Sequence, residues 1–172
     1  MYKELKTYRS IRKYKDKPVE REKLDDIIKS ALIAPSSRNR KPWEFILVQD
    51  KKVLNAISRC KPHGASFAKD APAAVVVLAD PKKCDVWVED CSIAAYTIQL
   101  VARSLGLGSC WIQTRLREMD GDTGSEEYLK ELLGIPEGFA VECVITIGYG
   151  DEIKPEYTEE DMDFGKVHKD FY

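Results

Sequence analysis

The sequence predicts an α+β fold, in which helices flank a short central sheet that is antiparallel or mixed. Three observations lead to this prediction. The predicted helices outnumber the predicted strands, the two kinds of element do not alternate as regular βαβ units, and one strand candidate, Ala73–Ala79, is apolar at every position. A parallel α/β sheet would need the alternation, and a wholly apolar strand is typical of the covered centre of a sheet. The 172 residues contain no repeat or long linker, so we expect one domain over residues 1–172.

The first half of the chain contains the clearest helix, over Pro18–Ala34, after a short one predicted over Met1–Thr7. Its apolar residues recur at the spacing of one helical face. They are Leu24, Ile27, Ile28, Ala31 and Leu32. Pro18 suits the entry of this helix, and Pro35 ends it. A strand is then predicted over Phe45–Gln49 and a surface helix over Lys52–Arg59, before the apolar strand.

The second half contains a long apolar helix, predicted over Ser92–Leu105. Arg103 is its only charged residue, and Gly106 follows as a helix-ending glycine. We expect this helix to be buried nearly all round and, in so small a domain, to be shared with a second copy of the chain. Strands over Ser109–Gln113 and Glu142–Ile147, with a helix over Glu126–Leu133 between them, complete the predicted elements.

The composition excludes several classes of protein. A net charge of −2 predicts no nucleic-acid partner. The sequence has no apolar run of membrane-spanning length and no secretory leader, so we expect no membrane association and a cytoplasmic protein. The five cysteines are an odd number without CxxC spacing, which favours buried, reduced thiols over a disulfide framework or a zinc site.

The charge is unevenly distributed along the chain. Residues 1–17 carry seven Lys or Arg against two acids, whereas residues 151–172 carry eight acids against three lysines. Solvated surface would explain both ends. An anion site near the N-terminus is the sharper interpretation, because Arg9-Ser10-Ile11-Arg12 places two guanidinium groups around a hydroxyl. Such groups give a phosphate paired, charge-assisted hydrogen bonds.

Two further segments carry candidate chemistry. The loop Ala34–Trp43 offers hydroxyl, amide and main-chain groups that could read a flat heteroaromatic ring, although two prolines that end a helix and start a strand would also explain it. The segment Gly106–Gln113 contains GLG but lacks the third glycine of a dinucleotide fingerprint, and a helix precedes it where that fingerprint has a strand. A helix-ending glycine followed by a strand would explain this segment equally well.

The order and spacing of these motifs resemble the nitroreductase family. The shared pattern is RSIRKY, then APSSxNxxPWxF, then an apolar helix ending in GLGSCWI, then LLGIPEG and IGY, over roughly Leu5 to Tyr149. The resemblance is to the short form of the family. It implies a nitroreductase-like α+β fold in an intertwined homodimer, with FMN as cofactor in sites built from both chains.

The resemblance also implies site residues. Arg9, Ser10 and Arg12 match the segment that holds the FMN phosphate and the pyrimidine edge of the ring, and Arg12 is expected to stabilise the reduced flavin. Pro35, Ser36, Ser37 and Asn39 match the loop that contacts the ring, and Ile112, Gln113 and Thr114 match the strand end whose main chain faces N5. Lys166 is the predicted late cation on the phosphate, with Lys154 as the alternative. No metal ligand and no catalytic side chain is implied.

The sequence departs from the family pattern at two positions. Tyr8 stands where many members have an arginine, which leaves one phosphate contact in doubt. Lys41 stands where the family usually has Gln.

The implied activity is transfer of hydride from NADH or NADPH to a nitroaromatic, quinone or similar electron-poor acceptor, in a ping-pong cycle on FMN. Two alternatives stay open. One is a relative with other flavin chemistry, such as reductive dehalogenation or flavin cleavage, and the other is a flavin-binding or sensor protein without turnover. The sequence does not identify the physiological acceptor or the preferred nicotinamide.

Overall fold

The computed structural model describes residues 2–172, so Met1 of the predicted first helix lies outside the described residues. Four antiparallel strands form one sheet in the order β1-β2-β4-β3. The strands are β1 (Trp43–Val48), β2 (Ala73–Ala79), β3 (Gly108–Gln113) and β4 (Ala140–Gly148). The α+β prediction is therefore confirmed, and the sheet proves to be antiparallel in the part of the chain that the structure describes.

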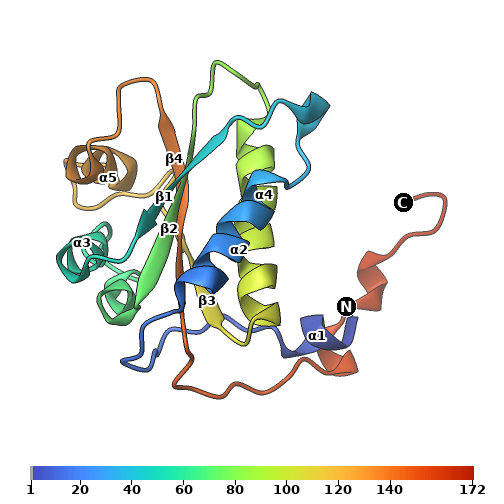
Figure 1. Ribbon diagram of the computed structural model, residues 1–172. Coiled ribbons are helices and arrows are strands. Elements are labelled where there is room, and N and C mark those ends of the chain that lie inside the picture. The colour runs from blue at the N-terminus through green and yellow to red at the C-terminus, as the bar shows by residue number, and fades with distance from the viewer. Residues whose placement is uncertain (1) are drawn as a thin grey trace.

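Helices cover both faces of this sheet (Figure 1). On one face lie α2 (Arg21–Leu32) and α4 (Trp87–Ser104), and on the other lie α3 (Lys51–Ile57) and α5 (Ser125–Leu133). The short α1 (Tyr2–Thr7) lies beside the end of α4. Each helix and strand predicted from the sequence is present, with ends displaced by up to five residues. Four 3-10 turns were not predicted, because three to five residues are too few to show a period. They are η1 (Ser37–Asn39), η2 (Ser66–Asp70), η3 (Glu159–Asp161) and η4 (Phe164–Lys166).

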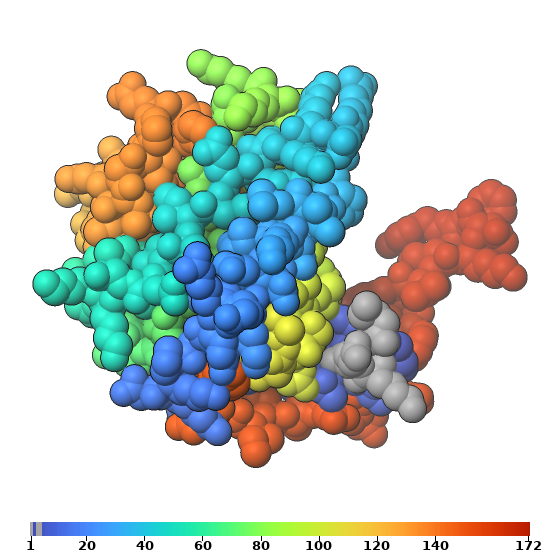
Figure 2. All heavy atoms as spheres, viewed as in Figure 1, coloured from blue at the N-terminus to red at the C-terminus, as the bar shows by residue number. Residues whose placement is uncertain are grey.

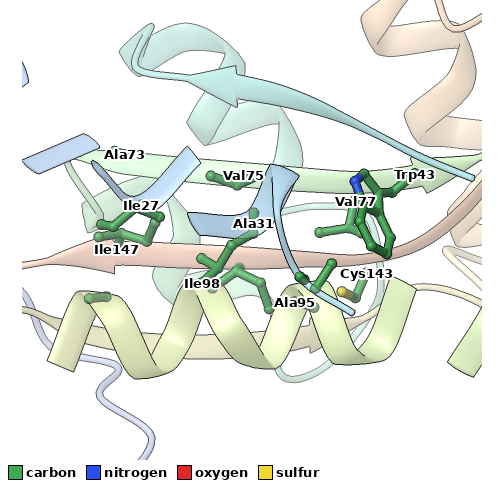
Figure 3. Close-up of a cluster of buried hydrophobic side chains, with 14 of the residues drawn as sticks. Ile27, Ala31, Trp43, Ala73, Val75, Val77, Ala95, Ile98, Cys143 and Ile147 are labelled. Atoms are coloured by element: carbon green, nitrogen blue, oxygen red, sulfur yellow. The ribbon is translucent and has the colours of Figure 1, made fainter. Parts of the chain in front are cut away.

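The central strand β2 explains why Ala73–Ala79 is apolar throughout. Successive side chains of a strand point to opposite faces of the sheet. Val75 and Val77 pack with Ile98 of α4 in the core on one face (Figure 3), whereas Val76 and Leu78 pack in the core on the other face. Both faces are covered by helices, so no position of this strand favours a polar residue.

The structure corrects the prediction for the long apolar helix. It begins at Trp87, not at Ser92, and it is buried on one face only. Ala95 and Ile98 are fully buried against the sheet, but Ile93 and Tyr96 are 41% and 43% exposed. The expectation of burial nearly all round is therefore wrong for a single chain. Because Gly106 adopts φ 75° directly after the helix, its predicted role in ending the helix is confirmed.

The chain after β4 leaves the body of the molecule. It first runs beside the N-terminal segment, where the main-chain N–H of Asp151 donates to the carbonyl of Lys13 (2.9 Å). Its last residues then project outward (Figure 2). Three apolar side chains of this tail, those of Phe164, Val167 and Phe171, are at least 69% exposed.

Within residues 2–172, none of the helices combines the length and the hydropathy that a membrane span needs. All five cysteines are buried and unpaired, as the sequence predicted.

Candidate functional site

The N-terminal segment Tyr8–Arg12 lies along the outer edge of β3. The main-chain N–H of Ile11 donates to the carbonyl of Ser109 (2.9 Å). Gly108 permits this close approach, because a Cβ at that position would lie 2.8 Å from Cβ of Ile11. The segment and the strand edge therefore form one surface, on which Ser10 and Arg12 flank Ile11.

The side chain of Tyr14 holds this segment against the sheet. Its hydroxyl donates to the carbonyl of Ile11 (2.7 Å) and shares a hydrogen bond with Oγ1 of Thr146 on β4 (2.8 Å). Burial raises the pKa of Tyr14 well above its usual range, so the group stays a neutral donor. The course of Ser10–Arg12 is thus fixed by contacts to two strands.

Four cations gather at this edge, and we call Arg12, Lys61, Arg117 and Lys154 the cationic edge. Nζ of Lys154 donates to the carbonyl of Ser10 (2.6 Å). Burial lowers the pKa of Lys61, and the positive charges of Arg117 and Arg12 act in the same direction. Like charges held this close favour an anionic ligand.

The thiol of Cys110 on β3 shows how tightly these cations are grouped. Burial raises the pKa of Cys110, whereas Arg12, Lys154 and Lys61 all lie close enough to lower it. The carboxylate of Glu152 lies beside them, and its Oε1 accepts from the main-chain N–H groups of Arg12 (2.5 Å) and Lys13 (3.2 Å) and lies 3.6 Å from Nζ of Lys154. Because this carboxylate is largely engaged with main chain, it only partly neutralises the four cations.

The end of β3 presents main-chain groups at the same surface. The carbonyl of Gln113 accepts from Nζ of Lys61 (3.2 Å), just as the carbonyl of Ser109 accepts from Ile11. Main-chain groups of alternate residues in a strand point to the same side. The N–H of Gln113 therefore faces the open edge of the sheet and not β4.

The side chain of Gln113 is engaged within the strand end. Its Oε1 accepts from the indole N–H of Trp111 (2.9 Å), and its Nε2 donates to the carbonyl of Arg115 (2.9 Å). The neighbouring Ile112 and Thr114 are fully buried. Of the three predicted residues at this strand end, Gln113 places a main-chain donor at the surface, while the side chains of the other two face the core.

The loop after α2 has a strained backbone. Arg38, Asn39 and Lys41 all have positive φ, between 47° and 55°. Such left-handed residues other than glycine are costly and cluster at functional sites. Among the hydrogen bonds that hold the loop are one from the N–H of Lys41 to Oγ of Ser36 (3.0 Å) and one from the N–H of Ser37 to Oδ1 of Asp90 (2.8 Å).

This loop and the cationic edge lie at opposite edges of the sheet. The loop runs directly into β1, whereas the cationic edge lies along β3, and β2 and β4 stand between these two strands. Neighbouring strands of a sheet are about 4.8 Å apart, so β1 and β3 are separated by about 14 Å. Within one chain, the predicted loop residues Pro35, Ser36, Ser37 and Asn39 therefore enter the sheet at the edge away from the cationic edge.

Other predicted positions lie as follows. The guanidinium of Arg9 donates to the carbonyl of Pro155 (2.6 Å) and lies 4.6 Å from the ring centroid of Tyr157, so it holds the C-terminal segment. Lys166 lies on the exposed tail, where its amine is 3.7 Å from Oδ2 of Asp163. It is Lys154, the alternative, that contacts the Ser10 segment.

The departure at Tyr8 has a structural consequence. Its ring packs edge-on against Tyr96 of α4, with centroids 6.1 Å apart, and burial raises its pKa to about 12. In place of a cation, this position provides a packed, neutral side chain.

Sequence reasoning missed Lys61 and Arg117, since neither belongs to a motif and each reaches the cationic edge only through folding.

Comparisons with known proteins agree with this architecture. The sequence profile of the nitroreductase family matches residues 5–61 and 59–149. A provisionally named NADH dehydrogenase/NAD(P)H nitroreductase of Archaeoglobus fulgidus is 40% identical over 169 residues, covering 95% of this chain and 94% of the relative. The FMN reductase (NAD(P)H) of Bacillus subtilis is 32% identical over 156 residues, covering 78% of this chain and 59% of the relative. Among solved structures, an FMN-dependent nitroreductase from Clostridium difficile R20291 is 52% identical, with a TM-score of 0.99 and full coverage of both chains.

Proposed function

The chain belongs to the nitroreductase family, and from this premise we propose that it passes hydride from NADH or NADPH to a small electron-poor acceptor, such as a nitroaromatic or a quinone, in two successive half-reactions. The protein is an NAD(P)H-dependent flavin oxidoreductase with FMN as cofactor. The observation that carries the proposal is the cationic edge beside the outward-facing N–H of Gln113.

The residues present fit FMN. Its phosphate and the electron-rich pyrimidine edge of its ring need cations and hydrogen-bond donors, and the cationic edge supplies both. We assign Ser10, Arg12 and Lys154 to direct contact with the cofactor, and Lys61 joins them because its amine adjoins Gln113. Arg9 acts one step away, by holding the segment that carries Lys154. FMN, when bound, supplies the hydride chemistry that links the two half-reactions.

The chain's own groups orient this chemistry without taking part in it as acid or base. The N–H of Gln113 would donate a hydrogen bond to the ring of bound FMN, and it neither gains nor loses a proton in the working pH range. The guanidinium of Arg12 would stabilise negative charge on the ring of bound FMN, because a cation that is already in place needs no reorganisation.

We further propose that the working unit is a homodimer with FMN sites made from both copies. The Ser36–Asn39 loop leads into β1, at the edge of the sheet opposite the cationic edge on β3, so we expect a second copy to supply it. The exposed Ile93 and Tyr96 on α4 give that copy an apolar face, and a pocket of about 460 Å³ between α1 and the end of α4 extends it. The exposed apolar side chains of the tail, those of Phe164, Val167 and Phe171, would also find apolar contacts on a second copy.

Replacement of Ile93 or Tyr96 by Asp is expected to halve the mass in solution. Obligate homodimers commonly bury more than about 2,000 Å², and a desolvated charge at the centre of such an interface is costly. Light scattering should give twice 19.6 kDa for the wild type and 19.6 kDa for either variant. Asn55→Asp, which adds the same charge on exposed α3, should stay dimeric. A wild-type protein that is monomeric with FMN bound would contradict the dimer.

The activity itself is tested by steady-state oxidation of NADH and NADPH by the FMN-loaded protein. We expect a nitroaromatic or a quinone to accelerate oxidation clearly, because the nicotinamide can be oxidised repeatedly only as fast as an acceptor reoxidises the flavin. Oxidation that no acceptor accelerates would favour a relative with other flavin chemistry. Bound FMN without any oxidation would favour a flavin-binding protein.

A further inference from the structure

A buried carboxylate lies next to the strand end that carries Gln113. Glu142 on β4 is 3% exposed, and its Oε2 accepts no hydrogen bond. Its Oε1 accepts one long bond from the hydroxyl of Ser92 on α4 (3.5 Å). Burial raises the pKa of Glu142, although the charge of Arg115 opposes the shift. Burying a carboxylate oxygen without a hydrogen bond lowers the stability of the folded protein, so stability does not explain why Glu142 is buried here.

The one cation within 4.0 Å of this carboxylate, in the part of the chain that the structure describes, is Arg115. Its Nε lies 4.0 Å from Oε2 of Glu142, and its main-chain N–H donates to the carbonyl of the same residue (3.2 Å). Its guanidinium also lies 5.7 Å from the ring centroid of Trp87. Arg115, which follows the end of β3, is thus held by three contacts. These are its main-chain hydrogen bond to Glu142, its ion pair with the carboxylate of Glu142, and the packing of its guanidinium near the ring of Trp87.

Arg115 in turn holds Gln113. The carbonyl of Arg115 accepts from Nε2 of Gln113 (2.9 Å), whose Oε1 accepts from the indole of Trp111 (2.9 Å). An unbroken series of contacts therefore runs from the buried carboxylate to the residue with the outward-facing N–H. We propose that Glu142 is a positioning residue whose carboxylate, through Arg115, fixes the strand end that presents the N–H of Gln113. The inference rests on the role proposed above for Gln113.

The variant Glu142→Gln separates positioning from general stability. Glutamine keeps the shape of the side chain and removes the buried charge. Because the folded-state pKa of Glu142 is raised, its ionised form opposes folding as pH rises through that pKa. We therefore expect the melting temperature of the FMN-free protein at neutral pH to be unchanged or higher, whereas a residue that serves stability alone would lower it.

Three further measurements test positioning in this variant. In the FMN-free protein, amide hydrogen exchange over residues 111–116 should become faster. In the loaded protein, FMN affinity should stay within about threefold, while the rate of flavin reduction by NAD(P)H should fall about tenfold, the size of effect that coupled neighbours show. Arg115→Gln should reduce the rate similarly, and the double variant should be no slower than either single variant. The control Glu44→Gln removes an exposed carboxylate of β1, which pairs with Lys83, and should change none of these quantities.

The outcomes separate this inference from the proposed function. A wild-type protein that binds FMN and is reduced, together with a Glu142→Gln variant of wild-type rate and exchange, would overturn the inference alone. A slower rate accompanied by a lower melting temperature would also overturn it, in favour of a structural role. A wild-type protein that does not bind FMN would overturn the proposed function first.

Discussion

Replacing Arg12 and Lys154 together by alanine is expected to weaken FMN binding by at least about a hundredfold. Each change removes a charge-assisted contact that contributes about 1.5–3 kcal/mol, which corresponds to roughly ten- to 150-fold. The two residues lie on either side of Ser10, one in the N-terminal segment and one in the segment after β4. Without the amine of Lys154, the negative charge of Glu152 is no longer neutralised and repels the FMN phosphate. Titration of the FMN-free protein, followed by flavin fluorescence, measures the change.

Two single variants serve as controls for this experiment. Lys13→Ala removes an exposed cation of the same segment, whose main chain, which the variant keeps, makes the contacts to Glu152 and Asp151. Lys166→Ala removes the late lysine that the family resemblance suggested. We expect both variants to bind FMN as the wild type does. If Lys166→Ala loses FMN and Lys154→Ala does not, the tail and not the cationic edge supplies the late cation.

Replacing Gln113 by proline is expected to slow flavin reduction by more than about a hundredfold. Proline lacks the N–H, and removal of one preorganised main-chain or amide donor from a reacting centre typically costs 10²–10³ in rate. The structure indicates that the variant can fold, since this N–H faces the open edge of β3 and takes no part in the pairing with β4. Edge strands tolerate proline at such positions. Stopped-flow reduction by NAD(P)H is the measurement, with circular dichroism to verify the fold.

Gln113→Ala is the matched comparison. It keeps the main-chain N–H and removes the side chain that bonds Trp111 and Arg115. We expect a loss of about tenfold, no smaller than that expected for Glu142→Gln, since the support of the donor is removed and the donor itself stays. A folded alanine variant as slow as the proline variant would show that the side chain, not the main chain, contacts the flavin.

The sheet order gives the proposed dimer its rationale. The Ser36–Asn39 loop leads into β1 and the cationic edge lies along β3, at opposite edges of the sheet, so the two do not adjoin within one chain. The exposed Ile93 and Tyr96 form an apolar face on α4. A symmetric partner packed on that face could bring its own loop to the first copy's cationic edge and complete two sites at once.

The sequence alone determined those features that depend on near neighbours in the chain. A helical face repeats every three to four residues and a strand face every two, so Pro18–Ala34 and Ala73–Ala79 were predictable within a few residues. Gly106, which ends α4 with positive φ, was predictable for the same local reason. The family resemblance added the cofactor class and the Ser10 and Gln113 segments, although their roles in this chain remain proposals.

Tertiary structure alone decided which distant residues meet. Lys61 reaches the carbonyl of Gln113 across 52 positions, and Lys154 reaches Ser10 across 144. No periodicity encodes such pairs, because they depend on the strand order β1-β2-β4-β3 and on how loops pack at its edge. The same is true of Glu142, whose burial and unsatisfied oxygen follow from packing between α4 and β4. The sequence showed a carboxylate in an apolar strand, and only folding placed it next to the end of β3 that carries Gln113.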